Sequence, residues 1–402
     1  MALAGCGSSS GAGKAAGGRY NISIKYVAPP AVSSKTLQAT IDKAFLGPVS
    51  ASTLNPEIVR SLQWAAAGLT ASQQTLLNKC MQATSCTTGH GSVTIAFADS
   101  NGENPWRKAF RYEGTAQAIA YPQVKKIIYL DADGNLQTFL SDFRSLIAQK
   151  VNVIEGAFDF ASSMLPLIRQ AAAAGIVVVP DTEPVPNATA PSEILTTIEP
   201  DICKNWTALA HLVVSKLGKN GNAAVYTGPA GNPYAAVWQP CVSKVLAANG
   251  WKEVIQGNTD WTPQGSQQAG QALIASGKKV NAIIYDYTPE DLLSPYLKAG
   301  KTPPATFIGS TGDFGFLQVY RQAQQQGHPF LAYVPQGAVW ELRTGVTVAM
   351  DALAGKHVPT QIIVPEPMFP VSSLMKYYSP AAPTGTTILP LVPVSSLRSV
   401  LG

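Results

Sequence analysis

The sequence predicts an α/β fold of two doubly wound parallel-sheet lobes, preceded by a mostly helical N-terminal extension. From Val93 onward, short apolar strands alternate with helices, and the same alternation restarts near Ile202. Strands are apolar along their whole length when helices cover both faces of a parallel sheet. The chain has 402 residues, which is long enough for two lobes that each bury a core.

Composition excludes several classes of protein. Apolar residues make up 46% of the chain, too many for a disordered protein, and charged residues only 13%, which suits a secreted protein. The formal net charge of +5 is spread along the chain, so we expect no nucleic-acid partner. No stretch of about 18 apolar residues predicts a transmembrane helix.

The N-terminal residues resemble a lipoprotein processing site. Leu3-Ala4-Gly5-Cys6 reads as a lipobox, and residues 7–18 form a Gly/Ser/Ala-rich flexible tether. We therefore expect Cys6 to be acylated and to anchor the protein to the outer face of a membrane or in the periplasm. The alternative is a free cysteine in a disordered leader.

The four other cysteines are expected to be structural. In an oxidising compartment the nearest pairing is Cys80 with Cys86, which leaves Cys203 with Cys241, although the other pairings stay open. The sequence has no CxxC motif, and no second Cys/His pair completes a site with Cys86 and His90, so no metal site is expected.

Residues 19–91 are expected to form an extension packed on the main body. Residues 20–26 alternate between apolar and polar positions and predict a short strand. Residues 56–83 have helical periodicity, with Gly68 as a possible interruption.

Lobe 1 is expected to span residues 92–199 and 336–360. Its strands are predicted at 93–97, 126–130, 151–154 and 176–180, and its helices from Pro105, at 136–147 and at 162–174. Asn104-Pro105 is a good helix start, because Asn accepts the first free amides and Pro has no N–H to leave unpaired.

Lobe 2 is expected to span residues 200–335. Its helices are predicted at 202–217, 235–248, 267–276 and 290–300, and its strands at 223–227, 254–256, 280–285, 306–309 and 331–334. A last helix at 339–355 returns to lobe 1. The Pro-rich tail, residues 361–402, is expected to run along the surface and to finish strands near a hinge.

Six motifs in order resemble those of the type I periplasmic binding proteins, within them the ribose-binding group, over residues 92–360. They lie at 99–106, 176–181, 198–201, 228–231, 259–261 and 333–336. The resemblance implies two lobes joined by a three-strand hinge that close on a small sugar, polyol or related solute. It also implies docking on the permease subunits of an ABC importer, with no cofactor and no catalytic residues.

The resemblance also implies ligand-binding residues. Trp106 and Trp261 would stack on the face of a sugar, Asp181 would accept hydrogen bonds from its hydroxyls, and Asn104 and Gln336 would supply further contacts. Each has a structural alternative: the two tryptophans as core, Asp181 and Asn104 as helix caps, Gln336 as a hinge residue. Loops that follow parallel strands meet at one edge of the sheet, which would bring such residues together.

The sequence departs from the ribose-binding pattern at several pocket positions. Thr182 and Trp238 stand where that group has arginines, and Asp286 and Thr311 lie in strand-end loops that also differ from its pattern. Arg107 could supply one replacement guanidinium. The loss of two arginine clamps predicts a ligand that is larger, less hydroxylated or partly apolar.

Other functions find less support in the sequence. No HExxH, Walker loop or GxGxxG motif is present, so we do not expect an enzyme. A transcription repressor would need an N-terminal helix-turn-helix where residues 1–20 form a tether. A lipid-anchored sensor for a membrane receptor stays an alternative to transport. We expect a monomer.

Overall fold

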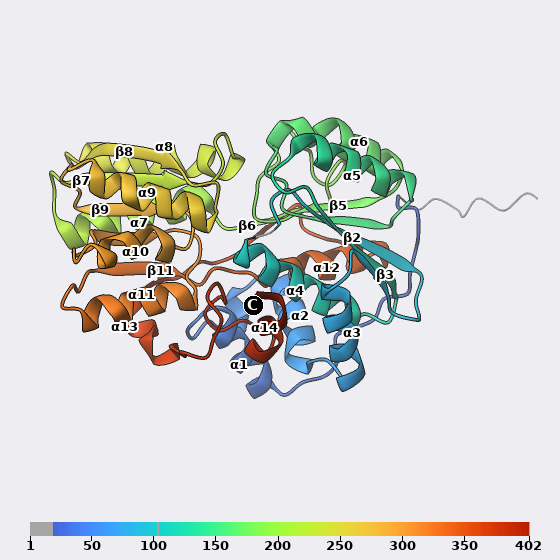
Figure 1. Cartoon of the computed structure of the whole chain (residues 1–402). Coiled ribbons are helices and arrows are strands. Elements are labelled where there is room, and N and C mark those ends of the chain that lie inside the picture. Colours follow the sequence, from blue (N-terminus) through green and yellow to red (C-terminus); the bar gives the residue numbers. More distant parts are fainter. Residues whose placement is uncertain (1–18, 103, 402) are drawn as a thin grey trace, which may run out of the picture.

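The structure is a computed structural model that describes residues 19–102 and 104–401 as two α/β lobes lying side by side (Figure 1). Cys6, the predicted lipidation site, lies outside the described residues. Within the described ranges, no helix has both the length and the apolar character needed to cross a membrane.

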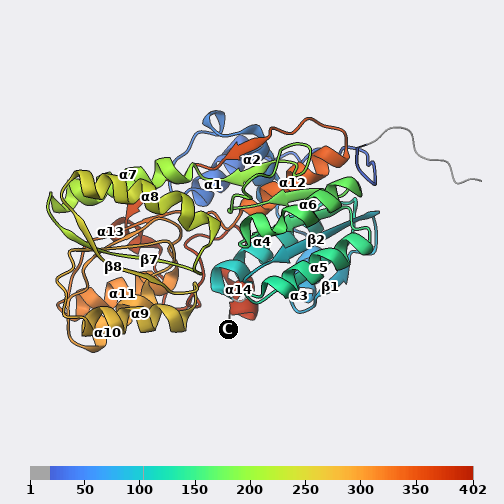
Figure 2. The same cartoon turned by 90° about the horizontal axis from the view of Figure 1, so that it is seen from above.

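Lobe 1 contains a five-stranded sheet of order β1-β3-β2-β4-β5. Its strands are β1 (Ser85–Thr87), β2 (Val93–Asp99), β3 (Val124–Asp131), β4 (Val153–Gly156) and β5 (Val177–Pro180). All pair in parallel except β1, which runs antiparallel to β3. Two helices cover each face: α5 (Leu136–Ala148) and α6 (Leu165–Ala173) on one, α4 (Pro105–Ala120) and α12 (Glu341–Leu353) on the other (Figure 2).

Lobe 2 contains a six-stranded sheet of order β13-β11-β10-β9-β7-β8. Its strands are β7 (Asn222–Thr227), β8 (Lys252–Asn258), β9 (Ala282–Tyr285), β10 (Ala305–Ile308), β11 (Ala332–Pro335) and β13 (Met368–Pro370). Only β13 pairs antiparallel. One face carries α7 (Ile202–Leu217) and α8 (Pro233–Ala248), the other α9 (Pro263–Ala275), α10 (Glu290–Lys298) and α11 (Phe314–Gln325).

The hinge has a small sheet of its own. β6 (Thr197–Glu199) and β12 (Gln361–Ile363) pair in parallel, separately from the two large sheets. Near them the chain passes between the lobes three times, in the segments 200–201, 336–340 and 364–367. This arrangement agrees with the hinge that the resemblance implied.

The N-terminal extension packs on lobe 1, as predicted. Its helices are α1 (Ser34–Ala44), α2 (Pro56–Ala67) and α3 (Ala71–Met81), and they lie against α4 and α12 (Figure 1). Gly68 ends α2 with a φ of 72°, a conformation that favours glycine, so the predicted helix at 56–83 is two helices.

Both expected disulfides are present. Cys80 bonds to Cys86, at the junction of α3 and β1, and Cys203 bonds to Cys241, between α7 and α8. The pairing of nearest cysteines is thereby confirmed, and it fixes the extension to lobe 1 and the two helices of lobe 2 to each other.

The structure differs from the prediction in three places. Residues 20–26 are not a strand, because only isolated backbone bonds, such as Asn21 N–H to the Gly175 carbonyl at 2.8 Å, join them to lobe 1. Helix α11 was not predicted. The tail does not only follow the surface, because α13 (Val371–Leu374) and α14 (Val394–Leu401) bury side chains in the cores of lobe 2 and lobe 1 respectively.

Candidate functional site

A cavity lies between the two lobes and is walled by both of them and by the hinge. It contains about 580 Å³ of space free of protein atoms, part of it open to solvent. Its lining residues are Asn104, Trp106, Arg107, Thr182, Glu183, Pro200, Tyr234, Trp261, Asp286, Tyr287, Ser310, Gly337, Ala338, Glu341 and Glu366.

The start of α4 supplies the wall from lobe 1. Asn104 Oδ1 accepts the backbone N–H of Arg107 at 2.9 Å, which caps the helix, and Pro105 occupies its first turn. The capped helix fixes the position of Trp106, whose indole N–H donates to the Gly337 carbonyl at 3.0 Å and whose ring stacks on Phe110. Trp106 therefore joins the wall of lobe 1 to the hinge segment 336–340.

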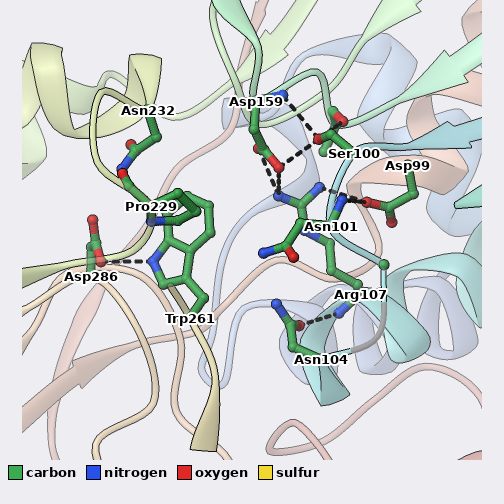
Figure 3. A network of polar contacts seen from close by, with 12 residues as sticks. Asp99, Ser100, Asn101, Asn104, Arg107, Asp159, Pro229, Asn232, Trp261 and Asp286 are labelled. Atoms are coloured by element: carbon green, nitrogen blue, oxygen red, sulfur yellow. Dashed lines mark hydrogen bonds and ion pairs between the residues drawn. The ribbon is translucent and has the colours of Figure 1, made fainter. Parts of the chain in front are cut away.

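Arg107 is a buried cation that carboxylates of lobe 1 neutralise. Its Nη2 lies 2.8 and 3.0 Å from the two carboxylate oxygens of Asp159, and its Nη1 lies 3.3 Å from Asp99 Oδ1 (Figure 3). Burial raises the pKa of Asp99 to about 6, against the opposing effect of the nearby guanidinium. These partners hold the guanidinium at the edge of the cavity and satisfy most of its donors.

Asp286 organises the wall from lobe 2. It follows β9, and its Oδ1 accepts the indole N–H of Trp261 at 2.9 Å (Figure 3). Its Oδ2 accepts the indole N–H of Trp238 at 3.0 Å and the hydroxyl of Thr227 at 2.5 Å. Burial raises the pKa of Asp286 to about 6, although these donors favour the ionised form. Its carboxylate is thus already occupied by groups of the protein.

The structure brings five of the nine predicted ligand residues to the cavity lining. They are Asn104, Trp106, Arg107, Trp261 and Asp286. Both lobes contribute, because residues 104–107 belong to lobe 1 and Trp261 and Asp286 belong to lobe 2. Whether each of the five touches a ligand stays a prediction.

The other four predicted residues lie behind the lining. Trp238 stacks on Trp206 with ring centroids 4.0 Å apart. Gln336 Oε1 accepts the Ala338 N–H at 2.7 Å, and its amide nitrogen is 3.4 Å from the Pro365 carbonyl, so it joins two hinge segments. Thr311 is buried against Gly337, and the Asp181 carboxyl lies with Glu155 beneath α12. In this arrangement these side chains support the walls.

The sequence reasoning missed several lining residues. Tyr234 had a visible signal, because Asn232-Pro233-Tyr234 at the start of α8 repeats Asn104-Pro105-Trp106 at the start of α4. Thr182 and Glu183 directly follow the predicted Asp181. Ser310 directly precedes the predicted Thr311. No motif marks Glu341 or Glu366, which the fold alone brings to the cavity.

Three glutamates at the hinge side have raised pKa values. Burial raises the pKa of Glu183 well above its ordinary value. The nearby carboxylates raise this pKa further, whereas the Arg107 guanidinium lowers it. Burial also raises the pKa of Glu341, reinforced by the charge of Glu366. Burial raises the pKa of Glu366 to about 8, although Asn205 donates to it at 3.2 Å. The cavity therefore holds carboxyl groups that are costly to ionise in the absence of a positive partner.

The arrangement is suited to binding. Among the described residues, no group of three or more His, Cys, Asp or Glu side chains is placed to hold a metal ion. What the cavity offers is aromatic surface from Trp106, Trp261, Tyr234 and Tyr287, with carboxyl oxygens between lobes that a hinge connects.

Comparisons with known proteins agree with this architecture. A family model for the periplasmic binding protein domain matches residues 95–357. Comparison with curated protein sequences found no match.

Solved structures with the same fold include three sugar or polyol complexes. The periplasmic component of the arabinose ABC transporter from Shewanella sp. ANA-3, bound to L-arabinofuranose, has a TM-score of 0.61 at 20% identity, over 70% of this chain and 93% of that chain. A solute-binding protein from Bacillus halodurans C-125 with myo-inositol has a TM-score of 0.61 at 16% identity, over 72% of this chain and 99% of that chain. The solute-binding protein of a 5-methylthioribose transporter from Thermotoga lettingae TMO, in complex with 5-methylthioribose, has a TM-score of 0.61 at 17% identity, over 72% of this chain and 89% of that chain. At these identities the similarity shows the fold.

Proposed function

The chain belongs to the periplasmic binding protein domain family and has its type I fold, and from this premise we propose that it captures a small solute for an ABC importer. The solute binds between the lobes, the closed protein docks on the membrane subunits of the importer, and the solute is released there. The protein acts by binding alone and performs no chemistry on its ligand.

One observation supports this proposal above the others, namely a single cavity with walls from both lobes. Trp106 comes from lobe 1 and Trp261 from lobe 2, and hinge residues such as Gly337 lie between them. A ligand in this position contacts both walls only when the lobes are close together, so its binding energy favours the closed form. The transporter can then distinguish the loaded protein from the empty one by shape.

The walls of the cavity and the proteins of similar fold suggest the ligand class. Those proteins hold arabinofuranose, myo-inositol and 5-methylthioribose. Two indole rings on opposite walls are suited to a flat ring with apolar faces. We therefore propose a single-ring or similarly small solute that is partly apolar.

The test is ligand binding with matched tryptophan variants. A screen of small solutes by thermal shift identifies a ligand, because a molecule bound only by the folded state raises the Tm. Trp106→Ala and Trp261→Ala should then each weaken its binding at least about tenfold, since each removes an aromatic wall. Trp64→Phe is the control, because Trp64 of the N-terminal extension packs on Tyr121 at the end of α4 and does not line the cavity. Full affinity in both cavity variants would contradict the proposed site.

We also propose that Cys6 carries a lipid anchor and that the protein works as a monomer outside the cytoplasm. The lipobox Leu3-Ala4-Gly5-Cys6 supports the anchor. In cells, Cys6→Ala should move the protein from the membrane fraction to the soluble fraction. Uptake of the identified ligand by cells with and without the protein distinguishes an importer component from a sensor.

A further inference from the structure

The cavity carries more acidic than basic groups. Its described lining includes four carboxyls, those of Asp286, Glu183, Glu341 and Glu366, and one guanidinium, that of Arg107. Arg107 does not balance them, because it is already paired with the carboxylates of Asp99 and Asp159 behind the wall. No lysine or histidine is among the described lining residues.

The three glutamates come from separate segments of the chain, and none of them forms a salt bridge with a described lysine, arginine or histidine. Glu183 follows β5, Glu341 begins α12, and Glu366 lies between β12 and β13. Glu183 is 6% exposed and its Oε2 has no hydrogen-bond partner, and Glu341 is 2% exposed. A buried carboxylate without a partner is costly, which makes these side chains unusual unless something else completes them.

The charged groups around these glutamates are mostly acidic too. Near Glu183 lie Asp159, Asp286 and the paired Arg107. Near Glu341 lie Glu366, Asp181 and Glu199. The surroundings thus add negative charge and supply no free cation, so a negatively charged ligand would be repelled.

The aromatic walls also favour a positively charged ligand over a negatively charged one. The indole N–H groups of Trp106 and Trp261 are engaged by the Gly337 carbonyl and by Asp286, so these side chains offer their ring faces. The Arg107 guanidinium already lies 5.4 Å from the Trp106 ring centroid and 6.0 Å from that of Trp261. Such distances are typical of cation–π contacts, so both rings are placed to face a cation, and the charge of Arg107 itself is paired with Asp99 and Asp159.

A neutral sugar and a protonated amine make different demands on these groups. Each sugar hydroxyl both donates and accepts, whereas an ammonium group only donates. Here the indole donors and most of the guanidinium donors are used within the protein, while the Glu183 oxygen is unpaired. The cavity offers acceptors and ring faces, and it offers few donors.

We propose that the ligand is a small organic cation whose positively charged nitrogen is held by the hinge glutamates, Glu183, Glu341 and Glu366. Its carbon skeleton packs between Trp106 and Trp261. This inference rests on the proposed function and narrows its ligand class from small solutes in general to those with a positively charged nitrogen, such as a protonated amino sugar or a quaternary ammonium compound.

The first experiment compares cations with neutral isosteres on the whole protein. Thermal shift and calorimetry are run on a broad solute library that includes glucosamine with glucose, and choline with its neutral isostere dimethylbutanol. A cation that binds at least about tenfold tighter than its neutral partner supports the inference. A best ligand that is neutral or anionic overturns it and leaves the proposed function intact. Binding of no compound at all contradicts the proposed function itself.

The second experiment removes one charge at a time. Glu183→Gln and Glu341→Gln keep the side-chain shape, and each should weaken binding of the cation at least about tenfold while changing that of the neutral isostere little. Glu155→Gln is the matched control, because Glu155 is a buried carboxyl that does not line the cavity. Equal losses for the cation and its isostere would show a structural role and overturn the assignment.

The pH dependence gives an independent readout. The pKa of Glu366 is raised to about 8 by burial, and those of Glu183 and Glu341 are raised as well. A protonated carboxyl cannot pair with a cation, so affinity for a quaternary ammonium ligand should rise from about pH 6 to about pH 9 and protons should be released on binding. A flat pH profile would count against the hinge glutamates as the binding groups.

Discussion

Asp181 shows how one position along a chain decides the environment of a side chain. It directly follows β5, and its carboxyl lies with that of Glu155 beneath α12, where a side chain at Gly345 would collide with both. The next residues, Thr182 and Glu183, line the cavity instead. Thr182 has a φ of 63°, so the chain turns out of the extended conformation directly after Asp181, and the residues after this turn reach the cavity while Asp181 stays in the core.

The buried pair predicts a stability that falls with pH. Burial raises the pKa of both Glu155 and Asp181 well above their ordinary values, so the folded state keeps protons that the unfolded state loses at about pH 4. Between these values the folded state binds more protons than the unfolded state, and the free energy of unfolding therefore decreases as pH rises. Asp181→Asn removes one titrating group and keeps a hydrogen-bonding partner for Glu155, so its Tm relative to wild type should increase with pH.

Thermal unfolding of the two proteins from about pH 4.5 to about pH 9 measures this difference. Asp133→Asn is the control, because Asp133 lies on an exposed loop before α5. A Tm difference between the Asp181 variant and wild type that is the same at every pH would contradict the buried pair as its cause.

At the scale of elements, local signals in the sequence explain what was predictable. The alternation of apolar strands with helices identified β2 to β5 and β7 to β11, because each helix covers a strand that neighbours it in sequence. Asn104-Pro105 marked the start of α4, since its cap is made by residues next to each other. The disulfides followed from the small number of cysteines.

The elements that were not predicted depend on distant contacts. Residues 20–26 alternate like a strand, yet no neighbouring strand is available to pair with them. β1 and β13 have three residues each and join the edges of sheets whose other strands lie elsewhere in the chain. The hinge glutamates come together in the same way: Glu183 and Glu366 are distant in the sequence and meet in one cavity beside the paired strands β6 and β12.

The two disulfides should differ in their contribution to stability because the loops they close differ in length. The bond from Cys203 to Cys241 spans 38 residues and that from Cys80 to Cys86 spans 6. The chain-entropy model gives about 4 kcal/mol for the longer loop and about 2 kcal/mol for the shorter one. Unfolding of the double-serine variant of each pair, by heat or denaturant, measures the two costs. A larger loss for the Cys80–Cys86 pair would contradict the entropic explanation for these bonds.

At the scale of the whole molecule, the C-terminal tail connects the lobes a fourth time. Val371 and Leu374 of α13 are buried in the core of lobe 2, and Val392 and Leu397 are buried in the core of lobe 1. Figure 1 shows α13 against lobe 2 and α14 against α4 of lobe 1. Any opening of the hinge that separates the lobes must therefore stretch or detach the segment 375–391 between them.

Within that segment the tail contacts the first turns of two helices, one in each lobe. The N–H of Phe314, which begins α11 of lobe 2, donates to the Thr386 carbonyl at 2.9 Å. Gly385 lies so close to Pro105, at the start of α4 in lobe 1, that a Cβ would be 2.2 Å from the Pro105 Cβ. Farther along, the Val392 N–H donates to Glu113 of α4 at 2.9 Å. The tail thus touches the helix start that carries Trp106, which couples lobe separation to the cavity wall.

The tail should therefore limit how far the empty protein opens, and weakening its attachment to lobe 1 tests this. Leu397→Ala removes a fully buried side chain of α14, which costs about 2–5 kcal/mol of packing. We expect a larger radius of gyration for the ligand-free variant in small-angle X-ray scattering, and the wild-type value once ligand closes the lobes. Because part of the variant population is then open, its apparent affinity should also fall. Leu146→Ala, on α5 in the other core of lobe 1, should lower stability without this expansion. Identical scattering of the ligand-free Leu397 variant and wild type would mean that the hinge segments alone set the opening, and that the tail follows the lobes without restraining them.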